Sequence, residues 1–175
     1  MKLLKIRAFA WLVAAVIMIL SVFAGAYTSF AGMRNDAMAA FEREMMPLIN
    51  QAMIHAHDIN SVAQNYLDSG EIFTISISRF VAEIQATDDP GEIYEYFVLL
   101  NRAVWEIYDT LIGGNMEMAD TNRTLVINFH LNFMQMDMLL EQARYNNIAG
   151  NFNNTLDRGL GFMIRPFIDK MPRFD

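Results

Sequence analysis

The feature that most constrains this chain is a run of twenty-five residues without a charged side chain, from Ala8 to Gly32. A helix rises about 1.5 Å per residue, so a helix of this length exceeds the roughly 30 Å hydrocarbon core of a bilayer. Lys2, Lys5 and Arg7 lie directly before the run. The pattern predicts that residues 1–32 form a basic segment and a transmembrane anchor.

Charge is distributed unevenly around this run. The other ten basic residues and all twenty acidic residues follow Gly32. Basic residues are retained on the cytoplasmic side of membranes, so we expect a cytoplasmic N-terminus and an extracytoplasmic body. A body this acidic repels phosphate backbones, which argues against nucleic-acid binding. The chain has no cysteine, which excludes disulfides, thiol catalysis and zinc–thiolate sites.

The same run also fits a secretory leader, because Ala24-Gly25-Ala26 is an acceptable cleavage site. The uncharged residues continue past Ala26 to Gly32, which favours an uncleaved, single-pass anchor. Aromatic rings are expected near both membrane interfaces, which suits the two ends of the run. The predicted contacts with membrane lipid are Trp11, Leu12, Ile17, Leu20, Phe23 and Tyr27.

Residues 33–158 have the apolar periodicity of an all-α domain, an antiparallel bundle of about four helices with long first and last members. From Met33 to Leu67, apolar residues recur at gaps of three and four, as in helices that pack by one stripe, including coiled coils. Pro47 predicts a kink inside this helix. Asp68-Ser69-Gly70 predicts its end.

Two shorter helices are predicted in the middle of the chain. Glu71 to Ala86 has a helical stripe; residues 73–78 also alternate as a strand would, but the helical neighbours favour a helix. The run from Asp89 to Glu92 predicts the next start, with Asp89 as N-cap, a proline at the first helical position and Glu92 reaching back. Gly113-Gly114-Asn115 predicts the end of that helix.

A last helix is predicted from Thr121 to at least Arg144, and it is apolar on two sides. Such a helix is either central in its bundle, the interpretation we favour, or in contact with another chain. Several asparagines follow in a helix where asparagine is a poor former, so they either bind a partner's backbone or end the helix. The candidate partner-binding residues are Met134, Met138, Tyr145, Asn146, Phe152 and Asn153.

Residues 159–175 form an amphipathic, basic tail in which Pro166 and Pro172 prevent a long helix. Such a segment either lies on a membrane surface or caps its own bundle, and we favour the cap.

No motif for catalysis or cofactor binding is present in the sequence. His55 and His57 point about 200° apart on a helix and cannot share a metal ion; His55 is expected to be a hydrogen-bonded core residue. Glu-x-x-His pairs, phosphate loops and nucleophile elbows do not occur. We therefore predict no cofactor, no metal, no small-molecule substrate and no enzymatic activity.

The sequence resembles the LemA-like family of bacterial membrane proteins in three segments. Tyr145-Asn146 and Phe152-Asn153 match two aromatic–asparagine pairs seven residues apart, with Phe152 in place of the family's second tyrosine. Met46-Pro47-Leu48-Ile49 is similar to a segment of the family's first helix, and the N-terminal anchor is the third likeness. The family's Ser-Phe-Pro turn is absent. The resemblance implies an anchored, mostly antiparallel helical bundle without an established catalytic activity.

Two functions remain open from sequence. The leading hypothesis is a membrane-anchored scaffold that binds a protein partner or a second copy of itself. The alternative is an extracytoplasmic sensory bundle, or co-receptor, that binds a small ligand between helices.

Overall fold

The computed structural model describes residues 2–67, 72–114 and 116–174, with side chains described from Phe9 onward except those of residues 72–74. Within these ranges the chain is helical and has no strand, so the all-α prediction is confirmed. The elements are α1 (Lys2–Ala40), η1 (Phe41–Met45), α2 (Met46–Ala63), α3 (Ile72–Ala86), α4 (Pro90–Tyr108), η2 (Asp109–Gly113), α5 (Asp120–Gln142), α6 (Arg144–Leu156), α7 (Gly161–Ile164) and η3 (Arg165–Phe167).

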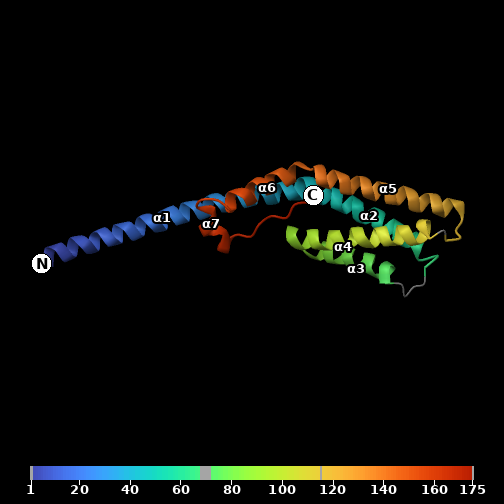
Figure 1. Cartoon of the computed structure of the whole chain (residues 1–175), viewed down its shortest axis with the longest axis horizontal. Helices are drawn as coiled ribbons and strands as arrows, with labels where there is room; N and C mark the ends of the chain where they lie inside the picture. The colour runs from blue at the N-terminus through green and yellow to red at the C-terminus, as the bar shows by residue number, and fades with distance from the viewer. Residues whose placement is uncertain (1, 68–71, 115, 175) are drawn as a thin grey trace.

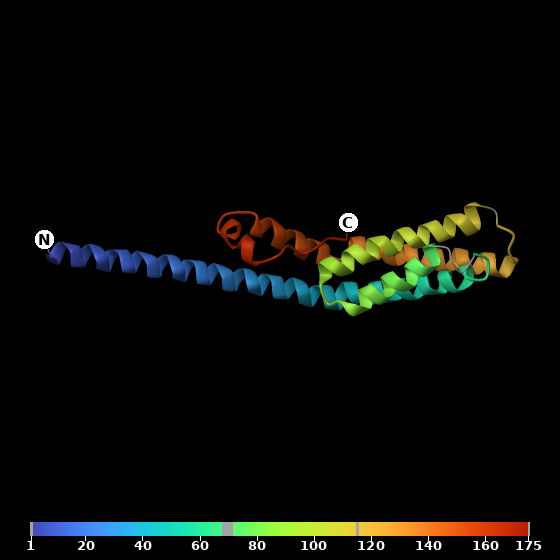
Figure 2. The ribbon, with the colours of Figure 1, turned by 90° about the horizontal axis from the view of Figure 1, so that it is seen from below.

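The first three elements form one continuous helical rod, and the N-terminal part of α1 projects far beyond the rest of the molecule (Figures 1 and 2). Its most apolar 18-residue window has a mean hydropathy of 2.4, and none of that window is buried. The helix is therefore long and apolar enough to cross a membrane. Helical structure continues across the predicted boundary between residues 32 and 33.

The kink predicted at Pro47 takes the form of a π-helical segment just before it. In η1 the amide of Met46 donates to the carbonyl of Phe41, five residues back. Proline has no amide hydrogen and its ring crowds the preceding turn, so a wider turn accommodates it. The rod changes direction between α1 and α2 (Figure 1).

The bundle forms around α2, which packs against α5 along much of its length and also contacts α4 and α3. The helix α3 packs chiefly on α4 (Figure 2). Aliphatic side chains and one phenylalanine, each almost fully buried, fill the space between these helices: Ile49, Ile59, Ile77, Ile84, Ile93, Leu100, Ile107, Phe133 and Leu140.

The helix predicted over Glu71 to Ala86 is confirmed as α3, which begins at Ile72. The start of α4 is also as predicted, because the Asp89 carboxylate accepts hydrogen bonds from the amides of Gly91 (2.7 Å) and Glu92 (3.2 Å). Glu92 does not reach back to the cap amide; its carboxylate accepts from the Thr87 hydroxyl. The predicted stop at residues 68–70 lies outside the described residues. The stop predicted at Gly113-Gly114-Asn115 is confirmed for its described part, because helical structure continues through η2 and ends at Gly113 with Gly114 as its cap.

Two predictions about the last helix are wrong. The helix does not run unbroken to Arg144, because Ala143 adopts an extended conformation (φ −61°, ψ 140°) and separates α5 from α6. Nor is α5 central: it packs mainly on α2 at the edge of the bundle (Figure 1). Leu131 and Met138, which lie on one of the two predicted apolar sides of this helix, are consequently exposed.

The tail folds back along the molecule. After α7 and η3, which lie beside α1, residues 168–174 run without helix alongside α6 towards the junction of α1 and α2 (Figure 1). Ile164, Ile168, Met171 and Phe174 are buried against the core. The tail thus packs on its own chain as predicted, although part of it faces outward.

Candidate functional site

The break at Ala143 creates the site, because interrupting a helix leaves amides and carbonyls without intrahelical partners. The side chain of Asn146 donates to the carbonyls of Leu140 (2.8 Å) and Glu141 (2.9 Å), at the end of α5. The Glu44 carboxylate, from η1, accepts from the amide of Tyr145 at 3.1 Å, in the first turn of α6. A carboxylate is favoured there because the helix dipole is positive at its N-terminus.

Two asparagines of α6 hold the tail by its backbone. The Asn146 side chain donates to the carbonyl of Phe174 (3.0 Å) and accepts from the amide of the same residue (2.9 Å). Asn153 repeats the arrangement at Met171, donating at 2.7 Å and accepting at 2.9 Å. We call these two reciprocal pairs the asparagine clamps. A primary amide can do this because it carries both donors and an acceptor.

The spacing of the clamps matches the geometry of the two segments. Asn146 and Asn153 are seven helical residues apart, which is about 10.5 Å at 1.5 Å per residue. Met171 and Phe174 are three residues apart, which is about 10 Å in an extended chain. One face of α6 therefore binds an extended segment at two points. Both clamps use only main-chain groups of that segment, so they do not depend on which side chains it carries.

The aromatic partners of the clamps point into the core. Tyr145 and Phe152 are almost fully buried, and the Tyr145 hydroxyl donates to the carbonyl of Pro172 at 2.9 Å. Burial raises the pKa of Tyr145 well above its ordinary value, so this hydroxyl stays protonated as a donor. Each aromatic–asparagine pair of α6 thus buries its ring in the core and directs its amide group at the tail.

Phe174 connects the tail to three other elements. Its ring lies 5.0 Å from that of Tyr94 and 6.1 Å from that of Phe97, both on α4. It also lies 6.0 Å from Phe41 in η1 and 6.5 Å from Tyr145 in α6. The clamp at Asn146 therefore fixes a ring at the meeting point of η1, α4 and α6.

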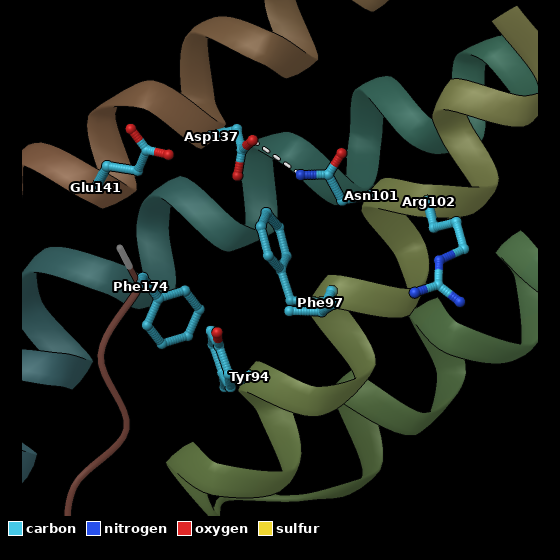
Figure 3. Close-up of a pocket in the computed structure, with 8 residues that line it drawn as sticks. Tyr94, Phe97, Asn101, Arg102, Asp137, Glu141 and Phe174 are labelled. Atoms are coloured by element: carbon cyan, nitrogen blue, oxygen red, sulfur yellow. Dashed lines mark hydrogen bonds between the residues drawn. The ribbon is translucent and has the colours of Figure 1, made fainter. Parts of the chain in front are cut away.

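Beside Phe174 is an open cavity of about 330 Å³ between α4 and α5 (Figure 3). Tyr94, Phe97 and Phe174 form its aromatic side, and Asp137 and Glu141 lie on the α5 side. It is the only one of the described cavities that combines aromatic rings with two carboxylates.

Asp137 is the most constrained carboxylate of this cavity. Asn101 donates to it at 2.8 Å from α4. Burial raises the pKa of Asp137 and the charge of Glu141 raises it further, while the hydrogen bond from Asn101 opposes both effects. A cationic group in the cavity would stabilise the ionised form of Asp137.

Five of the six predicted anchor residues have exposed side chains. Trp11, Leu12, Ile17 and Leu20 are exposed, as is Tyr27. Phe23 is half-buried, because its ring makes an edge-to-face contact with Phe167 at 5.8 Å.

The predicted partner-binding residues differ in how far the fold buries them. Met138 is exposed, whereas Met134 is half-buried against the core. Tyr145, Asn146 and Phe152 are buried, and Asn153 is half-buried in its clamp. The backbone that the asparagines bind in this structure belongs to the chain's own tail.

The histidines do not come together. His130 is buried, stacked on Tyr108 at 3.8 Å and set edge-on to Trp105 at 4.5 Å. His57 is exposed. His55 is half-buried, and its Nδ1 has no hydrogen-bond partner among the described residues, so the prediction of a hydrogen-bonded core histidine is wrong. Within the described ranges, no group of three or more His, Asp or Glu residues could hold a metal ion.

Sequence reasoning missed Glu44 as a cap and Phe174, Asn101 and Asp137 as cavity residues. Glu44 and Tyr145 are 101 positions apart, and no local pattern connects them. The spacing of Phe174 and Met171 was a usable sequence signal. In an extended chain these two residues are about as far apart as the two asparagines are on a helix.

Comparison with family models, curated proteins and solved structures finds no match to this chain.

Proposed function

We propose that this protein is a membrane-anchored scaffold or interaction protein without catalytic activity. In this proposal residues 8–32 span the bilayer, the N-terminus is cytoplasmic and the bundle is outside the cytoplasm. The basic residues directly before the span, Lys2, Lys5 and Arg7, support this orientation. The likeness of the two aromatic–asparagine pairs to the LemA-like signature supports placing the chain in that family, and it supports the same function.

The observation that carries the proposal is the continuous helical rod from α1 to α2. The rod joins the apolar segment to the core of the bundle without a loop, and the asparagine clamps fasten the tail beside it. A domain connected in this way is held at a fixed position above a membrane. Such rigidity suits a protein that presents a surface to partners.

The surface we assign to partners is the outer face of α5 around Leu131 and Met138. Their side chains are 59% and 51% exposed, and they lie seven residues apart on one side of the helix. Exposed apolar residues aligned on one face are typical of a protein contact. The partner is either a second copy of this chain or another membrane or extracytoplasmic protein.

A photo-activatable amino acid at position 131, expressed in the native host, tests this surface. We expect crosslinked adducts at 131 and 138, and few at Asn132, which is exposed on another side of α5. With the photo-activatable amino acid at a third position on the same face, the double variant Leu131→Glu/Met138→Glu should give no crosslinked adduct. The control variant Asn132→Glu should still give the adduct. Absence of any adduct at 131 and 138 would remove the proposed surface.

Orientation has a separate test. Protease added outside intact cells should digest the bundle and leave only the N-terminal segment. A bundle that survives until the cells are opened would contradict the extracytoplasmic placement.

The cavity beside Phe174 favours a second candidate function, the binding of a small ligand between α4 and α5. Arg102 also lines the cavity, so its two carboxylates leave one net negative charge facing the aromatic rings. This combination suits an organic cation, such as an alkylammonium group. A ligand that binds only the native state raises the melting temperature, so a thermal-shift screen with primary and quaternary amines tests this function. The stabilisation should disappear in Asp137→Asn; equal shifts in both proteins would contradict it.

A further inference from the structure

The segment Leu160–Phe167, which we call the tail turn, presents large apolar side chains outward. It comprises α7 and η3 with the residue before them. Its outward side chains and their exposed fractions are Leu160 (52%), Phe162 (67%), Met163 (55%) and Phe167 (63%). The neighbouring Ile164 is fully buried, so the turn is ordered by the fold and still keeps four apolar groups on its surface.

The tail turn lies against the part of α1 that belongs to the uncharged run. An apolar cavity of about 280 Å³ between them is lined by Met18, Val22 and Phe23 of α1 and by Leu160 and Met163 of the turn. On the far side of the bundle-to-anchor junction, Figures 1 and 2 show α7 set back along α1, away from the helices α2 to α5. The tail turn is thus displaced towards the anchor.

Polarity changes along α1 just beyond this contact. The next cavity, of about 350 Å³, is lined by Tyr27, Arg34 and Asn35 of α1 and by Asp169 of the tail. About twenty helical residues cross the hydrocarbon core, so a span that begins at Ala8 reaches its far boundary near Tyr27. Leu160 and Met163 contact α1 before that boundary. Phe167 lies at the boundary, because its ring contacts Phe23 and also lines the polar cavity, and Asp169 lies beyond it.

Charged groups flank the tail turn on both sides, and one charged residue, Arg165, lies within it. Asp157 forms ion pairs with Lys170 at 2.6 Å and with Arg165 at 3.5 Å. The pair with Lys170 joins the chain entering the turn to the chain leaving it, and the pair with Arg165 holds the one charged side chain of the turn against its base. A turn with an apolar tip and a charged base is the arrangement of an element that lies in a membrane interface.

We infer that the tail turn inserts into the bundle-side leaflet of the bilayer, where lipid acyl chains cover Leu160, Phe162, Met163 and Phe167. This inference rests on the proposed anchoring of residues 8–32. It gives the protein two membrane contacts, a spanning helix and a shallow insertion beside it. The asparagine clamps then connect the inserted turn to the bundle through residues 168–174.

The absence of native cysteine allows single-cysteine spin labelling of the full chain in phosphatidylcholine/phosphatidylglycerol vesicles. We would label Phe162→Cys in the turn, Ile17→Cys in the span and His57→Cys on the exposed side of α2. Collision of the label with oxygen, which dissolves in lipid, is compared with collision with a water-soluble nickel chelate. Met163→Cys provides a second position in the turn if Phe162→Cys does not fold.

We expect the labels at 162 and 17 to favour oxygen over nickel severalfold, and the label at 57 to do the reverse. A label at 162 that behaves like the one at 57, while 17 remains in lipid, overturns the inference and leaves the anchor intact. A label at 17 that is accessible to nickel overturns the anchor and the inference together.

Discussion

Asn146 and Phe174 form a reciprocal pair of hydrogen bonds, at 3.0 and 2.9 Å, between a helical side chain and the backbone at the end of the tail. The two N–H groups of the same asparagine are shared between the Phe174 carbonyl and two carbonyls at the end of α5. One buried amide thus closes the break between two helices and fastens the tail over that break.

Replacing Asn146 with alanine should lower the free energy of unfolding by about 3 kcal/mol, because several buried backbone groups lose their partners at once. Thermal or chemical unfolding of the full chain in detergent, followed by circular dichroism, measures the loss. The matched control is Asn147→Ala at the next, exposed position, which should change stability by less than about 0.5 kcal/mol. Equal effects in the two variants would contradict the clamp.

Asn153→Ala should act more locally and cost about 1 kcal/mol, because the side chain is only half-buried. Hydrogen exchange at the Met171 amide should accelerate, since that amide loses its acceptor. Asn154→Ala, at an exposed neighbour, is the control and should leave the Met171 amide protected. Unchanged exchange in Asn153→Ala would show that this clamp does not hold the tail.

Glu44→Ala should destabilise the start of α6 by about 1 kcal/mol, the typical value of a helix cap. The Tyr145 amide should then exchange faster, because it donates to Glu44. Glu42→Ala removes an exposed carboxylate from the same π-helical segment and should have little effect on that amide. If the Tyr145 amide exchanges as slowly in both variants as in the wild type, Glu44 does not stabilise the start of α6.

Stability should fall as the pH drops through the histidine range, in part because of His130. Burial lowers the pKa of His130 below its ordinary 6.5. Below 6.5 the unfolded chain binds a proton that the folded chain still rejects, so stability is lost from about pH 6.5 downwards until the folded pKa is passed. His130→Phe keeps a ring beside Tyr108 and should flatten the pH dependence, whereas His57→Phe should not. An equally steep profile in His130→Phe would assign the dependence to other groups.

Two glycines should respond oppositely to alanine. A Cβ at Gly150, inside α6, would lie 3.7 Å from the Arg173 side chain, an ordinary contact, so Gly150→Ala should stabilise by about 0.5–1 kcal/mol through helix propensity. A Cβ at Gly161 would collide with the carbonyl of Thr155 and lie 2.7 Å from that of Leu156. Gly161→Ala should therefore displace the tail turn and destabilise the chain, which unfolding of both variants would show.

The local features of this fold were predictable because they depend on neighbouring residues. The uncharged run, the stripe spacing and the N-cap at Asp89 all act within one or two helical turns, so the all-α fold and the start of α4 followed from sequence. The kink near Pro47 followed from the missing amide hydrogen, although its π-helical form did not.

The role of the asparagines on α6 was only partly predictable. Their poor helix propensity predicted that they bind a partner's backbone or end the helix. Asn146 instead binds the backbone of this same chain, at the end of α5 and in the tail. Part of that backbone belongs to the tail, and no periodicity could reveal that. The break at Ala143 was missed for a related reason, since alanine favours a helix and the distant residues Glu44 and Phe174 hydrogen-bond to the first turn of α6 that follows the break.

By itself the sequence determined the apolar length that can cross a bilayer, the helical class of the body and the positions of several helix ends. These properties are set by hydrophobicity, hydrogen-bonding capacity and backbone geometry over short distances. Only the tertiary structure decided that the tail returns to α6, that Phe174 reaches the cavity with Asp137, and that the tail turn lies beside Phe23. Those contacts join residues far apart in the chain, so their free energies depend on how the helices pack and not on any single segment.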